Sequence, residues 1–186
     1  GYYGPILSSG RPDIVLIRGD RFEMLPIAML AAYSGFTVVH LEAGDLSGVI
    51  DNKVRHAITQ LADYHFATNK ESYARLITMG VDPDKTFEFG SLDVEYALSL
   101  GLGDDYVSKH YALVCFHSTD EENGEAIKQE FFGGLDIIHI KSNSDYGPAT
   151  GFYEMEAGEY INKLQGASIL VGNSSSFLKE ASVFGI

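Results

Sequence analysis

Residues 12–66 constrain the fold more than any other part of the chain. In this stretch, short apolar runs with the length of buried strands alternate with segments of helical periodicity. Gly35 stands where a glycine commonly ends a helix. Such alternation is typical of a parallel α/β sheet. The expected elements are strands over residues 13–17, 37–41 and 64–69 and helices over residues 21–34 and 52–63.

Acidic side chains follow the ends of these expected strands. Asp20 and Glu42 each come just after a strand, and Asp51 is the expected N-cap of the second helix. Ligands of open α/β sheets bind outside the carboxyl ends of the strands, so these carboxylates are candidates for one site. Arg55 lies one turn beyond Asp51 on the same helix face. The alternative is that Asp20 and Asp51 only cap helices.

The order of motifs in this stretch resembles the UDP-N-acetylglucosamine 2-epimerases. The motifs are GDRFEM at residues 19–24, HLEAGD at 40–45, GVIDNKVRHAI at 48–58 and LADYHF at 61–66. The likeness is greatest to the hydrolysing branch, which makes N-acetylmannosamine for sialic acid synthesis. The non-hydrolysing branch carries GDT-type and PEE-type sequences where this chain has GDRFE and Ile50-Asp51-Asn52. The resemblance implies that Asp20, Glu42, Asp51 and Arg55 are catalytic.

A second α/β pattern fills the C-terminal half of the chain. Residues 101–110 contain glycines and acids without periodicity, so we interpret them as a linker. We expect one domain over residues 1–101 and another over residues 102–186. The resemblance implies two Rossmann-like domains in the GT-B-like arrangement, with the ligand in a cleft between them. The further expected elements are strands over residues 86–89, 111–116, 135–140 and 168–171 and helices over residues 70–79, 90–100, 120–131 and 156–164.

The turn GNSSS at residues 172–176 joins the last expected strand to the last expected helix. Its N–H groups and hydroxyls suit a phosphate at a helix N-terminus, although Asn and Ser are also ordinary N-cap residues. The resemblance assigns Asn173, Ser174 and Ser175 to the UDP diphosphate. It assigns Glu180, on the inward face of the helix, to the ribose hydroxyls. Phe177 departs from the glycine usual in the family and would narrow the nucleotide pocket.

His117 follows the expected strand at 111–116. By resemblance it matches the histidine of the family's second-domain HP or HR motif, with a role in catalysis and UDP binding. Ser118 stands where that motif has Pro or Arg, and a purely structural histidine is the alternative. Residues 142–145 resemble a loop that lies near the nucleotide in the hydrolysing branch.

Three further histidines and two arginines lie in the first half. His40 and His65 alternate within expected strands, so we expect them to pack inside the fold. His56 neighbours Arg55 and could reach the site. Arg18 and Arg21 flank Asp20, where either could lower the pKa of Asp20 or bind phosphate. The alternative is that these two arginines are exposed or ion-paired.

Composition narrows the function classes. The net charge of −13 over 186 residues argues against nucleic acid as a partner. One cysteine, Cys115, excludes an internal disulfide, and an apolar setting predicts that it is buried. The histidines show no metal-ligand spacing, so we expect neither a metal nor another cofactor. No stretch is apolar enough to span a membrane and no signal peptide is evident, which makes the cytoplasm the expected location.

The sequence thus predicts a hydrolysing epimerase that converts UDP-N-acetylglucosamine into N-acetylmannosamine and UDP. Three alternatives remain open: a non-hydrolysing epimerase, a non-catalytic sugar-nucleotide-binding remnant and, more distantly, a glycosyltransferase that shares the fold. The chain begins without methionine and ends just after a helix, so we expect a fragment that lacks both ends of the family fold and is inactive alone. The resemblance implies that the full-length protein is a homodimer or homotetramer.

Overall fold

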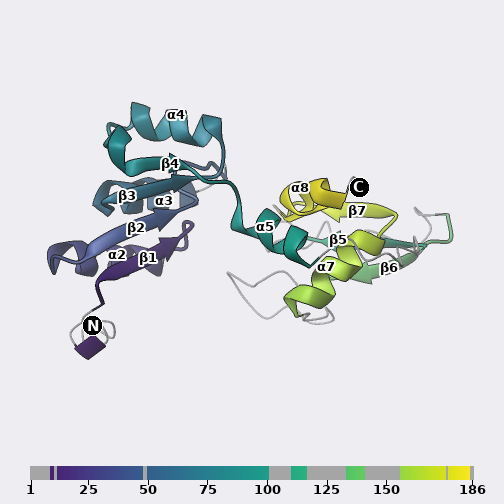
Figure 1. The fold of residues 1–186 in the computed structure, drawn as a ribbon. Coiled ribbons are helices and arrows are strands. Elements are labelled where there is room, and N and C mark those ends of the chain that lie inside the picture. The colour runs from purple at the N-terminus through teal and green to yellow at the C-terminus, as the bar shows by residue number, and fades with distance from the viewer. Residues whose placement is uncertain are drawn as a thin grey trace. The chain divides into compact units, whose positions relative to one another are not determined.

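The structure is a computed structural model that describes residues 9–10, 12–47, 50–100, 110–116, 133–140, 156–174 and 176–184. The chain divides into two compact units, Gly1–Ser91 and Leu92–Ile186 (Figure 1). Each unit has its own parallel sheet with helices packed against it. The predicted architecture of two Rossmann-like α/β units is therefore confirmed.

The first unit contains a four-stranded sheet in the order β1-β2-β3-β4, and every neighbouring pair of strands is parallel. Parallel neighbours require crossover connections, which the intervening helices supply. The strands are β1 (Ile14–Arg18), β2 (Thr37–Leu41), β3 (Tyr64–Ala67) and β4 (Thr86–Glu88). The connecting helices are α2 (Met24–Tyr33), α3 (Asp51–Leu61) and α4 (Lys70–Thr78), followed by a short 3-10 turn, η1 (Pro83–Lys85).

One face of this sheet forms the core of the first unit. Val15 and Ile17 of β1 and Val38 of β2 pack with Ala28 of α2 and Ile58 of α3 in one cluster. A smaller cluster joins Ala43, Ala67 and Leu76 beneath α4. Alternation along each strand sends every second side chain to this face, which is why His40 and His65 are also buried, as predicted.

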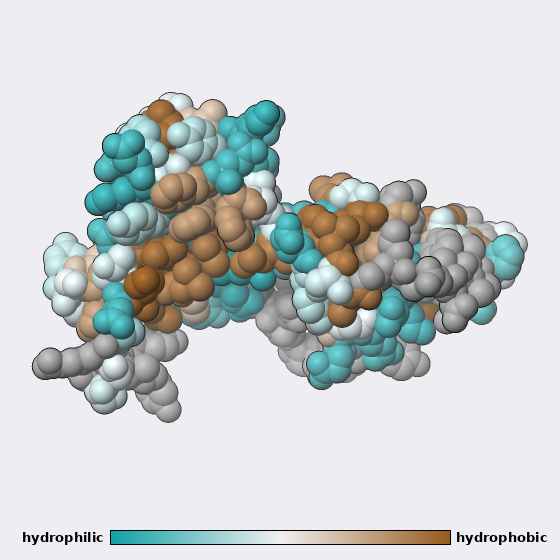
Figure 2. Space-filling model, viewed as in Figure 1, coloured by the Kyte–Doolittle hydropathy of each residue, from teal (hydrophilic) through white to brown (hydrophobic). Residues whose placement is uncertain are grey.

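The opposite face of the same sheet is apolar and exposed. The strand register places Leu16, Val39 and Tyr64 in one row across the sheet and Phe66 beside Phe87 in the next. Phe66 also contacts Phe87 and Phe89 through its ring. Leu16 is 63% exposed, and Tyr64 and Phe87 are also open to solvent, whereas Val39 is buried. Figure 2 shows a broad brown area over this unit.

We predict that Leu16→Lys in chain 1–186 lowers the fluorescence of bound 8-anilinonaphthalene-1-sulfonate, because it removes apolar surface from this exposed face. The matched control is Tyr33→Lys, since Tyr33 is 86% exposed on α2 and does not belong to the sheet face. Equal fluorescence for Leu16→Lys and the wild-type chain would contradict the assignment of this face as the apolar surface.

The second unit contains a three-stranded parallel sheet in the order β6-β5-β7. Its core joins Leu113 of the central strand with Ile161, Leu164 and Ala97. Ala97 lies in α5, so this helix belongs to the second unit and the division falls ten residues before the predicted linker. The elements are α5 (Leu92–Ser99), β5 (Tyr111–Cys115), β6 (Asp136–His139), α7 (Ala157–Gly166), β7 (Ile169–Gly172), α8 (Ser176–Lys179) and α9 (Ala181–Phe184).

Most predicted elements are present with ends shifted by a few residues. The first helix begins at Met24 rather than at residue 21, because Met24 and Leu25 donate to the carbonyls of Arg21 and Phe22 in a preceding turn. The last helix is divided into α8 and α9 at Glu180. The predicted helix at 120–131 lies outside the described residues. Among the described helices, none combines the length and apolar character that a transmembrane span requires.

Candidate active site

The carboxyl ends of β1 and β2 lie side by side and form the edge on which the candidate acids stand. Arg18 pairs with Leu41 in the strand register, and the N–H of Gly19 donates to the Leu41 carbonyl at 3.1 Å. Asp20 and Glu42 therefore begin neighbouring loops at one edge of the sheet. This is the edge at which open α/β sheets bind their ligands.

Asp20 forms an ion pair with Arg55 of α3. Nη2 of Arg55 donates to Oδ2 of Asp20 at 2.5 Å, although the two residues are 35 positions apart. Arg55 is buried, with 7% of its surface exposed, whereas the Asp20 side chain keeps 22%. Of the two arginines that flank Asp20, Arg18 donates from Nη2 to Glu42 and Arg21 donates from Nη2 to Glu23. Both arginines are therefore ion-paired, which was the alternative drawn from the sequence.

Two of the three nitrogen atoms of the Arg55 guanidinium are left unused by this pair. Its Nε and Nη1 atoms are buried and have no hydrogen-bond partner among the described residues. Buried guanidinium donors are normally satisfied, since leaving a charged donor without a partner is costly. These two donors are therefore available to an acceptor-rich or anionic ligand beside the Asp20 carboxylate.

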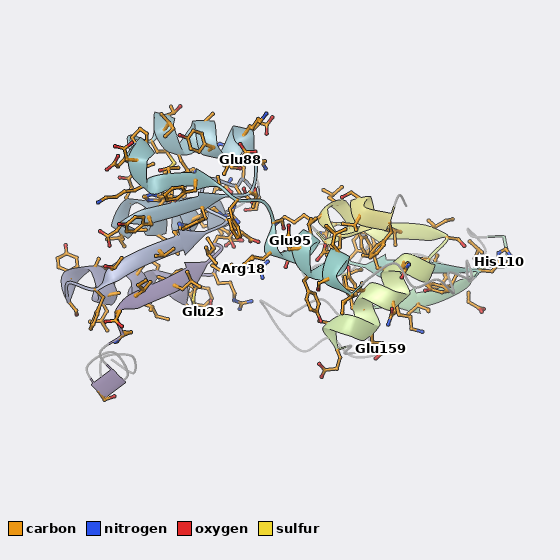
Figure 3. The ribbon with its side chains drawn as sticks, in the orientation of Figure 1. Arg18, Glu23, Glu88, Glu95, His110 and Glu159 are labelled. Atoms are coloured by element: carbon orange, nitrogen blue, oxygen red, sulfur yellow. The ribbon has the colours of Figure 1, made fainter. Side chains whose placement is uncertain are left out.

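Glu42 is held in an unusual backbone conformation. Its φ of 57° lies in the left-handed region, which residues other than glycine rarely adopt. Glu42 is 9% exposed and accepts a hydrogen bond from Nη2 of Arg18 at 2.8 Å. Arg18 lies at the end of β1 (Figure 3). Strained residues cluster at functional sites, so this geometry supports the choice of Glu42 as a site residue.

Asp51 is the first residue of α3 and not its N-cap, which corrects the prediction from sequence. Ile50 occupies the cap position, and no side chain caps this helix end. An acidic side chain in the first turn is still favourable, because it faces the positive end of the helix dipole. Asp51 lies one helical turn before Arg55. Asp20 does not cap α2 either, since Glu23 holds that position.

The loop after β2 is clamped against α4 by contacts that sequence reasoning missed. Asp45 accepts hydrogen bonds from the hydroxyls of Thr68 at 2.5 Å and Ser72 at 2.7 Å, and Arg75 donates to the Gly44 carbonyl. Gly44 has a φ of +80°, and a Cβ there would lie 2.5 Å from the Ser72 carbonyl oxygen. Any side chain at position 44 of the EAGD motif would clash, so this glycine is required. The contacts to Thr68 and α4 hold the loop that carries Glu42 in place.

Buried histidines support this edge of the sheet. His40 is fully buried, and burial lowers its pKa to about 4 despite the hydrogen bond to Gly19. Charges on His65 and Arg55 act in the same direction, whereas Asp45 opposes them. His56 is half-buried beside Arg55, and burial followed by the charges of Arg55 and Arg75 lowers its pKa. Both imidazoles are therefore neutral near pH 7.

The low pKa of His40 predicts that the first unit loses stability in mild acid. The unfolded chain takes up the proton near pH 6.5, whereas the folded state resists it until about pH 4. The neutral His40 ring therefore contributes its full stabilisation above pH 6.5, and this contribution is lost as the pH falls towards 4. The total loss in the free energy of unfolding is about 3 kcal/mol. Urea unfolding of wild-type chain and His40→Gln between pH 7 and 4 measures it. If the free energy of unfolding of His40→Gln fell with decreasing pH as steeply as that of the wild-type chain, the assignment would be contradicted.

The predicted diphosphate turn lies at the end of β7. Ser174 is buried, and its hydroxyl lies 2.9 Å from the hydroxyl of Ser176, which also contacts the Tyr160 hydroxyl. Burial raises the pKa of Tyr160 to about 12. Cys115 is buried, as predicted, and burial raises the pKa of its thiol. Glu180 is also buried, at the junction of α8 and α9 rather than on the face of one continuous helix.

Some predicted site residues fall outside the part of the chain that the structure describes. These residues are His117, Ser118, Ser175 and the loop at 142–145. Asn173 is described and exposed directly after β7. Among the described residues, no group of three or more His, Cys, Asp or Glu side chains is arranged to hold a metal ion.

Curated relatives share most of this chain. It is 30% identical to the UDP-N,N'-diacetylbacillosamine 2-epimerase (hydrolyzing) of Legionella pneumophila, over 97% of this chain and 56% of the relative. It is 29% identical to the UDP-N-acetylglucosamine 2-epimerase of Neisseria meningitidis serogroup B, over 94% of this chain and 54% of that relative. The chain thus spans little more than half the length of the curated relatives it matches.

Solved structures show the same fold at lower identity. The Neisseria meningitidis UDP-GlcNAc 2-epimerase bound to UDP-GlcNAc matches with a TM-score of 0.76 and 18% identity, over 97% of this chain and 59% of that chain. The Methanocaldococcus jannaschii enzyme in complex with UDP-GlcNAc and UDP matches with a TM-score of 0.76, 19% identity, and 97% and 60% coverage. The family described as UDP-N-acetylglucosamine 2-epimerase matches residues 3–146. The chain belongs to the UDP-N-acetylglucosamine 2-epimerase family.

Proposed function

We propose that the natural polypeptide containing this chain is a hydrolysing epimerase of a UDP-2-acetamido sugar. The most direct candidate reaction converts UDP-N-acetylglucosamine and water into N-acetylmannosamine and UDP. The observation that carries the proposal is the Asp20–Arg55 ion pair, whose guanidinium keeps two buried donors unused at a strand-end edge. A sugar nucleotide supplies both the acceptors that such donors need and a proton for a nearby carboxylate.

The reaction requires two proton transfers and the departure of a diphosphate. A carboxylate removes the proton at C2 while the C1–O bond to UDP breaks, which leaves a glycal with a C1–C2 double bond. Water then adds at C1 while a proton is delivered to C2 on the opposite ring face. Base and acid must therefore stand on two sides of the sugar. Donors must also stabilise the leaving diphosphate.

The candidate residues divide between these tasks. Asp20, Glu42 and Asp51 are the proposed acids and bases, because they stand at the ends of two adjacent strands and at the start of α3. Arg55 is the proposed electrostatic partner, through the donors that Asp20 leaves unused. The residues proposed to hold UDP and stabilise its departure are His117, Asn173, Ser174, Ser175 and Glu180.

Two observations support the hydrolysing branch. One is the sequence at the site, where Asp51 and the GDRFE motif replace the residues typical of the non-hydrolysing branch. The other is the Legionella relative, which is described as hydrolysing. That same relative acts on a diacetylated sugar by its name, so UDP-N,N'-diacetylbacillosamine is the second candidate substrate. The proposal includes a cytoplasmic homodimer or homotetramer.

The test is to incubate the natural polypeptide with UDP-N-acetylglucosamine and follow the nucleotide by phosphorus NMR. Free UDP together with N-acetylmannosamine is the expected result. UDP-N-acetylmannosamine without free UDP would overturn the hydrolysing assignment in favour of the other branch. Turnover of UDP-N,N'-diacetylbacillosamine alone would replace the substrate, and binding of UDP without any turnover would indicate a binding protein. Light scattering of the same sample tests the oligomer.

A further inference from the structure

Three segments that carry the site residues meet at one buried imidazole. His40, on β2, has no exposed surface. Its Nε2 atom lies 2.9 Å from the carbonyl oxygen of Gly19, directly before Asp20. Its Nδ1 atom lies 3.1 Å from the hydroxyl of Thr59, one helical turn beyond Arg55 on α3. His40 itself is two residues before Glu42.

The direction of each hydrogen bond follows from the groups present. A carbonyl oxygen only accepts, so Nε2 of His40 carries the proton and donates to Gly19. The neutral ring then leaves Nδ1 as an acceptor for the Thr59 hydroxyl. The Thr59 carbonyl in turn accepts from Nε2 of His65 at 2.9 Å. One tautomer of each imidazole satisfies these contacts.

Gly19 precedes Asp20 in a backbone conformation that glycine adopts readily. Its φ of 74° lies in the left-handed region, where a glycine moves with little steric restraint. Its N–H donates to the Leu41 carbonyl, and its own carbonyl accepts from His40. Both polar backbone groups of Gly19 are therefore held by β2. The backbone that leads into Asp20 is thus held in a fixed position relative to β2, the strand that leads to Glu42.

We propose that His40 is a positioning residue. Its paired contacts to Gly19 and Thr59 hold Asp20, and the helix that carries Arg55, in fixed positions relative to Glu42. The inference rests on the proposed function, because it assigns the geometry of the same acids. One imidazole on β2 thus links the residue after β1 to α3. Among the described residues, no other side chain hydrogen-bonds to both Gly19 and α3. Misplacement of a catalytic group by about 1 Å costs about 100-fold in rate.

The chain offers a matched control for ordinary destabilisation. His65 is also buried, pairs with His40 in the strand register and hydrogen-bonds Thr59, but its bond goes to the Thr59 carbonyl and not to Gly19. His65→Gln therefore perturbs the same core without releasing the peptide before Asp20. Two substitutions at position 40 separate the contacts, since a Gln amide replaces Nε2 of histidine and an Asn amide replaces Nδ1.

The experiment measures kcat, KM and melting temperature for the natural polypeptide and its variants. His40→Asn is expected to lower kcat about 100-fold with KM changed less than about 3-fold, because the acids are misaligned while the nucleotide still binds. His40→Gln restores most of kcat, since it keeps the donor to Gly19. His65→Gln keeps kcat despite a similar fall in melting temperature. Unchanged kcat in His40→Asn, or an equal loss in His65→Gln, would overturn the proposal.

A second measurement does not depend on turnover. The carbonyl 13C shift of Gly19 in labelled chain 1–186 reports the hydrogen bond that its oxygen accepts. This shift is expected to change in His40→Asn and to keep its wild-type value in His65→Gln. In His40→Gln it should stay close to the wild-type value. An unchanged shift in His40→Asn would overturn the positioning role. An inactive wild-type protein would instead reject the proposed function, so the two failures are distinguishable.

Discussion

Gly172→Ala is expected to destabilise the second unit strongly. Gly172 ends β7 and pairs with Cys115 of β5. A Cβ at this position would lie 1.8 Å from the Cys115 carbonyl oxygen and 2.7 Å from its carbonyl carbon. Both are backbone atoms of the central strand, so relief requires β5 and β7 to separate. We expect a loss of about 3 kcal/mol or more, measured as the urea midpoint of the second unit.

The control for this prediction is Gly158→Ala in α7. A Cβ at Gly158 meets nothing within 4 Å, and alanine is the better helix former. The urea midpoint should stay the same or rise slightly. Hydrogen exchange should show loss of protection in β5 and β7 for Gly172→Ala alone. A wild-type midpoint in Gly172→Ala would mean that the two strand ends are not as close as described.

Removal of the Asp20–Arg55 pair is expected to have the largest effect on activity. Arg55→Met leaves the Asp20 carboxylate without its cation in a partly buried setting, which should cost about 2 to 3 kcal/mol of stability. It also removes the donors proposed to stabilise the departing diphosphate, with a loss of kcat of about 100-fold or more. Asp20→Asn should lower kcat by about 100- to 10,000-fold, because the amide cannot accept the proton.

A surface pair of the same chemistry supplies the control. Arg21 donates to Glu23 at 3.1 Å, and its side chain is 52% exposed. Exposed ion pairs contribute about 0 to 1 kcal/mol, so Arg21→Met should change stability little. A double-mutant cycle of Asp20→Asn with Arg55→Met should show a coupling of about 1 to 3 kcal/mol in urea unfolding. Additive losses would contradict a direct interaction between the two side chains.

Local sequence patterns predicted the elements well but not the partners of the charged side chains. Apolar runs and helical periodicity located the strands of both sheets, because burial of alternate side chains is a local property. From the sequence, Arg18 and Arg21 were candidates to interact with the neighbouring Asp20, with ion pairs elsewhere as the alternative. Its partner is Arg55, 35 residues away, because α3 packs back against the sheet and brings Arg55 to the end of β1.

The backbone details of the site also lay beyond the sequence. The EAGD motif indicates a turn, but the left-handed φ falls on Glu42 as well as on Gly44. Helix propensity did not distinguish an N-cap from a first helical residue at Asp51, since acids are favoured at both positions. The alternation of His40 and His65 predicted burial. It did not predict that one imidazole would bond the peptide before Asp20, which depends on tertiary packing.

The most direct test of the central claim is deuterium incorporation at C2 when the natural polypeptide turns over UDP-N-acetylglucosamine in deuterated water. We predict N-acetylmannosamine with deuterium at C2 from the wild-type protein. Asp84→Asn should behave alike, since Asp84 is exposed in the turn η1 before β4. Asp20→Asn should form this product at least about 100-fold more slowly. Product that retains the C2 proton of the substrate, or wild-type rates in Asp20→Asn, would contradict proton transfer at this site.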